Sequence, residues 1–278
     1  MPEGPEMAAL AERLEAALAG SRLEQVEPLS FSSLKTATPG HGQLVGRTLA
    51  GITCRGKYDV LCFEGGFRLL LHLGQSGRVR LERRTVTGRP RGGVVRLGFD
   101  GRPQLTVTEA AKERRAGWWV LGPGDDGPLA TLGPEATSPQ AAALVRSTAA
   151  SRQLHPWLRD QQSLAGIGRG YADDICHRAH LSPFAIVGRL DPAERERLVG
   201  AIAGVLEEAL VRERQRQGGL EGDLGDRFAV HRRAGSPCPG CHGVLERVSF
   251  ASTELVYCPH CQCDDRVLAD RRLSRLLR

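Results

Sequence analysis

The 278-residue sequence predicts an α+β protein with a β-rich N-terminal part, a helical middle part and a small cysteine-containing C-terminal part. Short β-rich runs broken by glycine turns extend from Leu23 to about Leu121, a pattern typical of a β-sandwich or barrel. Beyond Pro139, apolar residues recur at the three- and four-residue spacing of amphipathic helices. Two Cys-x-x-Cys pairs lie near the C-terminus.

A short helix is expected before the first β-rich run. Its apolar residues recur at three- and four-residue intervals, and Gly20 follows as a C-cap. These apolar residues are Met7, Leu10, Leu14 and Leu18. After the β-rich part, residues 122–139 are crowded with Gly, Pro and small polar residues, and we expect a linker there.

Four helices are expected in the middle part: at 138–149, around Trp157, at 170–179 and from Asp191 to about Arg214. The last has Asp191 as an N-cap and proline in its first turn. The glycine-rich residues 216–227 predict a loop before the cysteine-containing segment.

Composition favours a folded protein, because 41% of the residues are hydrophobic and 25% are charged. No apolar run is long enough for a bilayer, and the N-terminus carries acids where a signal peptide needs basic residues. We therefore expect a cytoplasmic protein whose cysteines stay reduced.

The net charge of +6 is compatible with a polyanionic partner. Only three of the 38 basic residues are lysines, and arginine suits phosphate well, although a GC-rich genome produces the same bias.

The cysteine spacing predicts one structural zinc ion. Sixteen residues separate the two Cys-x-x-Cys pairs, a distance at which four thiolates can bind one tetrahedral metal. Four thiolates leave no open position, so this zinc is not expected to be catalytic. The nearby Cys263, His242 and His260 have poorer spacing and are expected to be bystanders. The expected ligands are Cys238, Cys241, Cys258 and Cys261.

The extreme N-terminus carries a candidate nucleophile. If Met1 is removed, Pro2 becomes a secondary amine that can attack an aldehyde-like carbon, and the neighbouring Glu3 can donate or accept a proton. Proline and glutamate are also simply favoured in the first turn of a helix.

A glycine-rich stretch at 164–170 precedes a short helix. Exposed backbone N–H groups at such a helix N-terminus suit phosphate, but a plain helix–helix turn explains the glycines equally well.

Five motifs together resemble the formamidopyrimidine-DNA glycosylase and endonuclease VIII family, in the family's order and over the whole chain. They are PEGPE at the start, Lys57 in RGKYDVL, HLGQSG at 72–77, LHPWLRDQQSLAGIGRGYADD at 154–174 and the four-cysteine segment ending in YCPHCQ. The resemblance implies an N-terminal β-sandwich (1–130), a helix–two-turn–helix domain (131–227) and a zinc-finger β-hairpin (228–278). It also implies a monomeric bacterial DNA repair enzyme that acts on damaged double-stranded DNA and is associated with the nucleoid when acting.

The resemblance also implies roles for individual residues. Pro2 would attack C1′ of a damaged nucleoside, Glu3 would assist opening of the sugar ring, and the resulting Schiff base would drive β- and δ-elimination. Glu6 would be a further N-terminal acid, and Lys57 would contact phosphate from a β-hairpin. The expected DNA contacts are Gln75, Arg114, His155, Gly168, Arg169 and Tyr171.

Five positions depart from the family pattern. Arg169 replaces an asparagine and His155 a lysine, both of which hold phosphate in the family. Ala116 replaces an aromatic wedge, Gln75 a methionine probe and Thr253 an arginine of the finger hairpin. Two alternatives to a glycosylase therefore stay open. One is a non-catalytic DNA-binding homologue, and the other is an unrelated zinc-ribbon factor, which would leave PEGPE and Lys57 unexplained.

Overall fold

The computed structural model describes residues 1–221, 227–250 and 253–268. The chain forms two compact units, one made of Met1–Thr131 with Leu210–Gly225 and the other of Leu132–Ala209 with Asp226–Arg278. The expected finger segment therefore shares a unit with the helical part instead of standing alone. By its contacts, the described segment from Leu210 to Glu221 groups with the first unit.

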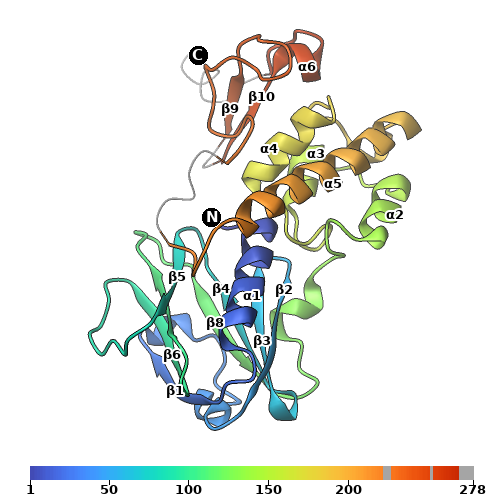
Figure 1. Ribbon diagram of the computed structural model, residues 1–278. Helices are drawn as coiled ribbons and strands as arrows, with labels where there is room; N and C mark the ends of the chain where they lie inside the picture. Colours follow the sequence, from blue (N-terminus) through green and yellow to red (C-terminus); the bar gives the residue numbers. More distant parts are fainter. Residues whose placement is uncertain (222–226, 251–252, 269–278) are drawn as a thin grey trace. The chain divides into compact units, whose positions relative to one another are not determined.

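The first unit is a β-sandwich of two four-stranded antiparallel sheets, which confirms the prediction and excludes a closed barrel (Figure 1). Side chains from both sheets share one hydrophobic core. One sheet has the order β1 (Leu23–Pro28), β6 (Gly93–Phe99), β7 (Gln104–Glu109), β5 (Gly77–Glu82), and the other has the order β2 (Leu49–Arg55), β3 (Tyr58–Phe63), β4 (Arg68–His72), β8 (Gly117–Leu121).

Helix α1 (Gly4–Leu18) packs on β2 and β3 and completes this core. All four apolar residues that predicted the helix are almost fully buried, and Gly20 follows the end of the helix with a positive φ of 75°. Helix α1 is therefore anchored by the sandwich core.

The second unit contains the predicted helices: α2 (Pro139–Ser147), α3 (Leu154–Arg159), α4 (Arg169–Arg178) and α5 (Pro192–Arg214), whose last turn lies in the first unit. Asp191 caps α5 as predicted, because its carboxylate accepts from the Glu194 N–H at 2.8 Å. Short 3₁₀ helices lie at Phe31–Ser33, His41–Leu44, Glu64–Gly66, Gly127–Thr131 and Val187–Arg189.

The C-terminal segment forms the expected antiparallel hairpin, β9 (Glu246–Phe250) and β10 (Thr253–Tyr257), followed by the short helix α6 (Pro259–Cys263). Its two small apolar clusters are built partly from cysteines. A segment with so little apolar surface to bury needs support from a metal or from neighbouring elements.

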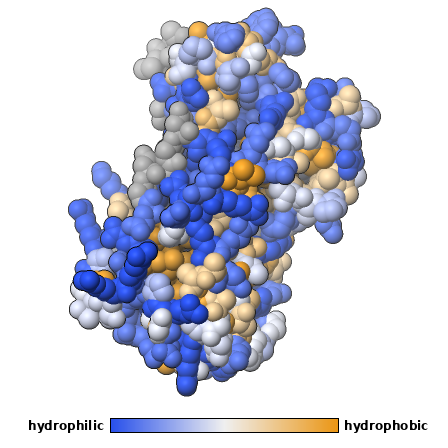
Figure 2. Space-filling view, in the orientation of Figure 1, coloured by the Kyte–Doolittle hydropathy of each residue, from blue (hydrophilic) through white to orange (hydrophobic). Residues whose placement is uncertain are grey.

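The visible face in Figure 2 is mostly hydrophilic, and its hydrophobic residues lie in scattered groups. Within the described residues, no helix combines the length and the apolar character needed to cross a membrane.

One acid in the sandwich lacks the partners that burial usually requires. Asp59 on β3 is fully buried opposite Leu71 of β4. Neither of its carboxylate oxygens has a hydrogen-bond partner in the part of the chain that the structure describes. Burial raises the pKa of Asp59 well above its usual value, and the nearby Arg13 guanidinium opposes this shift only in part. The ionised carboxylate therefore destabilises the fold.

We expect Asp59→Asn to stabilise the protein by about 1 to 3 kcal/mol near pH 8, because the amide cannot ionise. When folding raises the pKa of a carboxyl, the free energy of unfolding is highest below the pKa of the unfolded state. It falls as the pH rises towards the pKa of the folded state, because the unfolded state ionises first. The gain in Tm should therefore shrink as the pH falls towards about 4, the unfolded pKa of an aspartate. Thermal melts across this range test it, with the exposed Asp100→Asn as control, and a gain that does not change with pH would contradict it.

Candidate functional site

The first turn of α1 holds the N-terminal acids in a fixed arrangement. The Glu3 N–H donates to Glu6 Oε2 at 2.7 Å, and the Glu3 carboxylate accepts from the Glu6 N–H in return, which is a capping box. Glu3 is 3% exposed and Glu6 is fully buried. Pro2 directly precedes this turn and is itself buried. The structure thus brings the three N-terminal residues predicted from the sequence together at the start of an anchored helix.

Lys57 lies in the turn between β2 and β3, with only 7% of its surface exposed. It lies within electrostatic reach of His72 at the end of β4. Burial and the charge of Lys57 lower the pKa of His72 to about 4. The His72 imidazole is therefore neutral near neutral pH, and its Nδ1 accepts a hydrogen bond from the Gly74 N–H at 3.3 Å.

Two surface loops of the sandwich carry the next predicted residues. Gln75 lies in the 73–76 turn between β4 and β5, and Arg114 lies in the 110–116 loop between β7 and β8. Both side chains are exposed, whereas Ala116 is buried and presents no wedge to solvent. We call these two segments the paired loops, because Glu109, which the sequence analysis missed, bonds to the backbone of both. The only sequence signal for Glu109 was an acid at the end of an apolar strand.

The N-terminus of α4 carries Gly168 as N-cap and Arg169 as the first helical residue. The Arg169 Nε atom is buried without a hydrogen-bond partner among the residues that the structure describes. Tyr171, expected to contact DNA, is 1% exposed and packs edge-on against Phe228 with ring centroids 5.1 Å apart. Gly170 is needed for this packing, since a Cβ there would lie 2.1 Å from the Phe228 ring. Tyr171 is therefore a core residue.

His155 also lies elsewhere than the sequence suggested. It is fully buried, and its Nε2 lies 2.9 Å from Asp173 Oδ1. The other oxygen of Asp173 lies 2.6 Å from Nδ1 of His231. Two imidazoles thus flank one buried carboxylate inside the second unit. The role in phosphate binding inferred from the resemblance therefore requires this buried imidazole to become accessible.

Helix α4 holds the segment that leads into the finger. The Asp174 carboxylate accepts from three successive backbone N–H groups, those of Ala229, Val230 and His231, at 2.8 to 3.3 Å. One turn further, His177 Nε2 lies 3.1 Å from Cys238 Sγ. The sequence analysis missed these roles, although two adjacent acids inside a largely buried helix were a usable signal.

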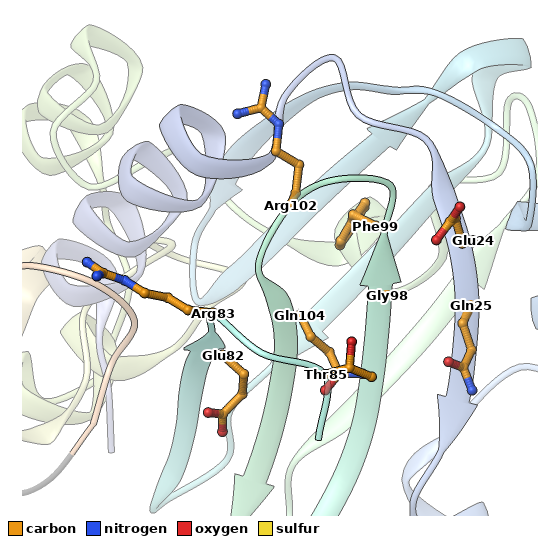
Figure 3. A pocket seen from close by; sticks show the side chains of 9 residues that line it. All are labelled: Glu24, Gln25, Glu82, Arg83, Thr85, Gly98, Phe99, Arg102 and Gln104. Carbon is orange, nitrogen blue, oxygen red and sulfur yellow. The ribbon is translucent and has the colours of Figure 1, made fainter. Parts of the chain in front are cut away.

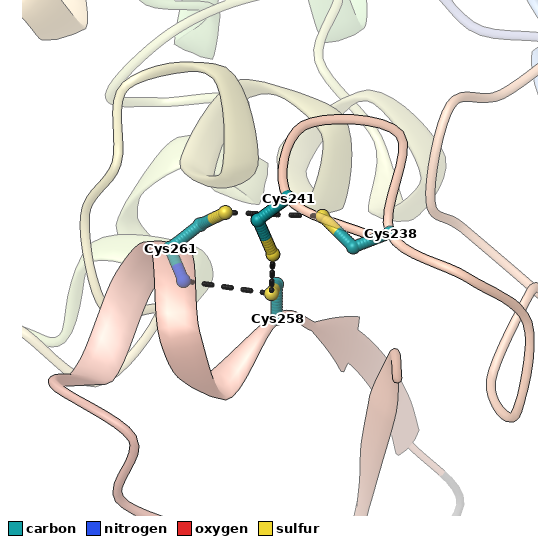
Figure 4. A group of neighbouring side chains, drawn as sticks. All are labelled: Cys238, Cys241, Cys258 and Cys261. Carbon is teal, nitrogen blue, oxygen red and sulfur yellow. Dashed lines mark hydrogen bonds between the residues drawn. The ribbon is translucent and has the colours of Figure 1, made fainter. Parts of the chain in front are cut away.

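The four predicted cysteines converge (Figure 4). Their Sγ atoms all lie within 4.8 Å of one another, with Cys238 to Cys261 at 3.8 Å and Cys241 to Cys258 at 3.5 Å. Tetrahedral zinc with bonds of about 2.3 Å to sulfur requires sulfur atoms about 3.8 Å apart, so this geometry fits the metal. A backbone hydrogen bond from Gly243 is the main cause that lowers the pKa of Cys241 to about 7, which favours the thiolate.

A separate pocket of about 380 Å³ lies at the opposite end of the β5–β7 ladder from Gln75 and Glu109 (Figure 3). Charged side chains of both signs line it, including Glu24, Glu82, Arg83 and Arg102. It contains none of the residues predicted for the site.

Comparison with known proteins identifies two successive domains. Residues 1–119 match the formamidopyrimidine-DNA glycosylase N-terminal domain, and residues 132–218 match the formamidopyrimidine-DNA glycosylase H2TH domain.

Relatives and solved structures agree with these matches. The formamidopyrimidine-DNA glycosylase of Symbiobacterium thermophilum is 35% identical over 94% of this chain and 89% of its own length. An uncharacterised formamidopyrimidine-DNA glycosylase-like protein of Mycobacterium tuberculosis is 42% identical over 53% of this chain and 94% of its own.

The crystal structure of the MutM (Fpg) protein of Thermus thermophilus superposes with a TM-score of 0.78 at 30% identity, covering 94% of this chain and 98% of that one. The Lactococcus lactis enzyme, solved with DNA containing an AP site, shares the fold with a TM-score of 0.81 at 24% identity, covering 94% and 99%. The domain matches and the near full-length relatives together show that the chain belongs to the formamidopyrimidine-DNA glycosylase family.

Proposed function

We propose that this chain is a bifunctional DNA repair enzyme, which removes a damaged base from double-stranded DNA and then cuts the strand at the abasic site. The observation that carries the proposal is the Pro2-Glu3 pair at the start of α1, held by the capping box on a helix buried in the sandwich core. Membership of a glycosylase family supports the same chemistry.

In the proposed reaction, removal of Met1 frees the Pro2 nitrogen as a secondary amine. Its lone pair attacks C1′, the bond from C1′ to the base breaks, the base leaves with the bonding pair, and the amine loses its proton. Glu3 then gives a proton to the ring oxygen as the bond between C1′ and O4′ breaks, which forms an iminium. Loss of a C2′ proton expels the 3′ phosphate, and a second elimination expels the 5′ phosphate.

The other residues would bind and position the DNA. Lys57 supplies a cation on the sandwich unit, and the exposed Gln75 and Arg114 project from the paired loops. On the second unit, Arg169 begins α4, where the helix N-terminus and a guanidinium together favour phosphate. A zinc ion on the four cysteines would tie the finger hairpin together, and it would take no part in the chemistry.

Blocking the Pro2 nitrogen should abolish catalysis. An N-terminal tag converts this nitrogen into an amide without a usable lone pair, so we expect tagged protein to bind abasic DNA but neither cut it nor form a borohydride-trapped adduct. The same tag at the C-terminus is the control and should leave trapping intact. Full cutting by verified N-terminally tagged protein would remove Pro2 as the nucleophile, and no trapping by the untagged protein would favour the non-catalytic homologue.

Cys258→Ser should bring the zinc content close to zero and weaken DNA binding, because the finger hairpin loses the tie that replaces a core. Elemental analysis and a binding titration measure the two effects. Cys263→Ser is the matched control, since Cys263 lies in the same short helix as Cys261 but outside the four-cysteine cluster. If metal is retained in the first variant and lost in the second, the ligand set is wrong.

Arg169→Ala should lower the affinity for abasic duplex and reduce the slope of log K against log salt by about one phosphate contact. Arg178 lies in the last turn of the same helix, paired with Glu208 at 2.7 Å, so Arg178→Ala is a control of equal charge. Equal slopes for the two variants would show that the N-terminus of α4 binds no phosphate.

A further inference from the structure

Glu109, the last residue of β7, is a fully buried carboxylate that bonds to both of the paired loops. Its Oε1 accepts from the Gln75 N–H at 3.1 Å. Its Oε2 accepts from the N–H groups of Arg115 and Ala116, both at 2.6 Å. One side chain therefore bonds to two loops that are separated by more than thirty residues of sequence.

The backbone of Glu109 is itself fixed. The residue pairs with Gly77 across the β5–β7 ladder, and its N–H donates to the Gly92 carbonyl at 2.7 Å. A carboxylate that accepts backbone N–H groups away from water makes strong hydrogen bonds, because the acceptor is charged and water does not compete. Glu109 thus connects the backbones of both loops to a fixed position in the sheet.

The loops also fit closely around this carboxylate. Gly74 has a φ of 58°, and a Cβ at this position would lie 2.5 Å from Glu109 Oε1 and 2.6 Å from the Ala116 nitrogen. The Gly74 N–H is held by the neutral His72. A glycine at position 74 therefore allows the two loops to approach this closely, and separating either loop from Glu109 breaks its hydrogen bonds to that carboxylate.

The side chains carried by the paired loops face outwards while their backbones are bound. Gln75 and Arg114 are exposed, and the Arg115 side chain is 61% exposed. An enzyme that extrudes a base must fill the gap left in the stack, and groups that do so must be held within a fraction of an ångström. Loops of this kind need a support that leaves their side chains free.

We propose that Glu109 is the positioning residue that locks the paired loops into one rigid element for discriminating damaged from intact DNA. This inference rests on the proposed function, since it assumes that Gln75 and Arg114 meet the duplex. Glu109 touches no DNA and acts through the backbone of these loops. Losing the hydrogen bonds from Glu109 to the paired loops should therefore weaken the discrimination of damaged from intact DNA and leave general phosphate binding unchanged.

Glu109→Gln tests the proposal, because one carboxylate oxygen becomes an NH₂ group that cannot accept from an N–H. Either the Gln75 bond or the Arg115 and Ala116 pair is then lost. The probes are a duplex with a tetrahydrofuran abasic analogue and the same duplex undamaged. We expect the Kd for the undamaged duplex, divided by the Kd for the abasic-analogue duplex, to fall about tenfold or more. The slope of log K against log salt on undamaged DNA should not change. Glu64→Gln, at an exposed glutamate of the same unit outside both loops, should change neither.

A double-mutant cycle separates positioning from general destabilisation. If Glu109 acts through the paired loops, Glu109→Gln should reduce discrimination much less in a Gln75→Ala background than in the wild type. Additive effects, or an unchanged Kd ratio in a folded Glu109→Gln variant, would overturn the proposal. If that variant does not fold, Glu109→Asp, which keeps the charge but shortens the reach, takes its place with the same criteria.

Borohydride trapping of the wild type on abasic DNA is run alongside. If the wild type is trapped but the Kd ratio of the Glu109→Gln variant is unchanged, the positioning role is refuted and the proposed enzymatic activity stands. If the wild type is not trapped but the Kd ratio of the Glu109→Gln variant is reduced, the proposed enzymatic activity is refuted and the positioning role stands.

Discussion

The proposed chemistry depends on one constraint: the nucleophile is the terminal nitrogen of the chain, and chain termini are normally the least ordered part of a protein. Here two features hold the terminus in place. The reciprocal bonds between Glu3 and Glu6 fix the first turn of α1, and the apolar face of α1 is buried in the core shared by both sheets. The sandwich therefore supports the atom that the proposed reaction uses. The acids beside it cap the helix, and in the proposed reaction Glu3 would also donate a proton.

In the second unit, the finger has too little apolar surface to fold by itself. Helix α4 supplies the missing contacts along one side: Asp173 and Asp174 bind the segment before the finger, and His177 lies against the metal-site residue Cys238. Arg169 begins the same helix. The proposed phosphate contact and the finger are thus built on one ten-residue element.

Most of the fold and the cysteine cluster could be predicted from the sequence, because periodicity and ligand spacing are local properties. The failures concern side chains whose partners are distant in sequence. His155 and Tyr171 were assigned to DNA by motif position, and the structure places both side chains in the interior, His155 beside Asp173 and Tyr171 against Phe228. Glu109 was overlooked because its partners are backbone groups of two separate loops. Thr253, noted for its departure from the family pattern, begins β10, and its side chain lies outside the described part of the chain.

Glu109 and Asp174 share a property with an evolutionary consequence: each carboxylate binds backbone N–H groups, which every residue except proline provides. A support of this kind tolerates almost any substitution in the segment that it holds. The residues at positions 75 and 114, which would meet DNA, can therefore diverge without loss of loop geometry. In this way a lineage could acquire a different lesion preference by changing a few exposed side chains, while the scaffold beneath them remains as it was.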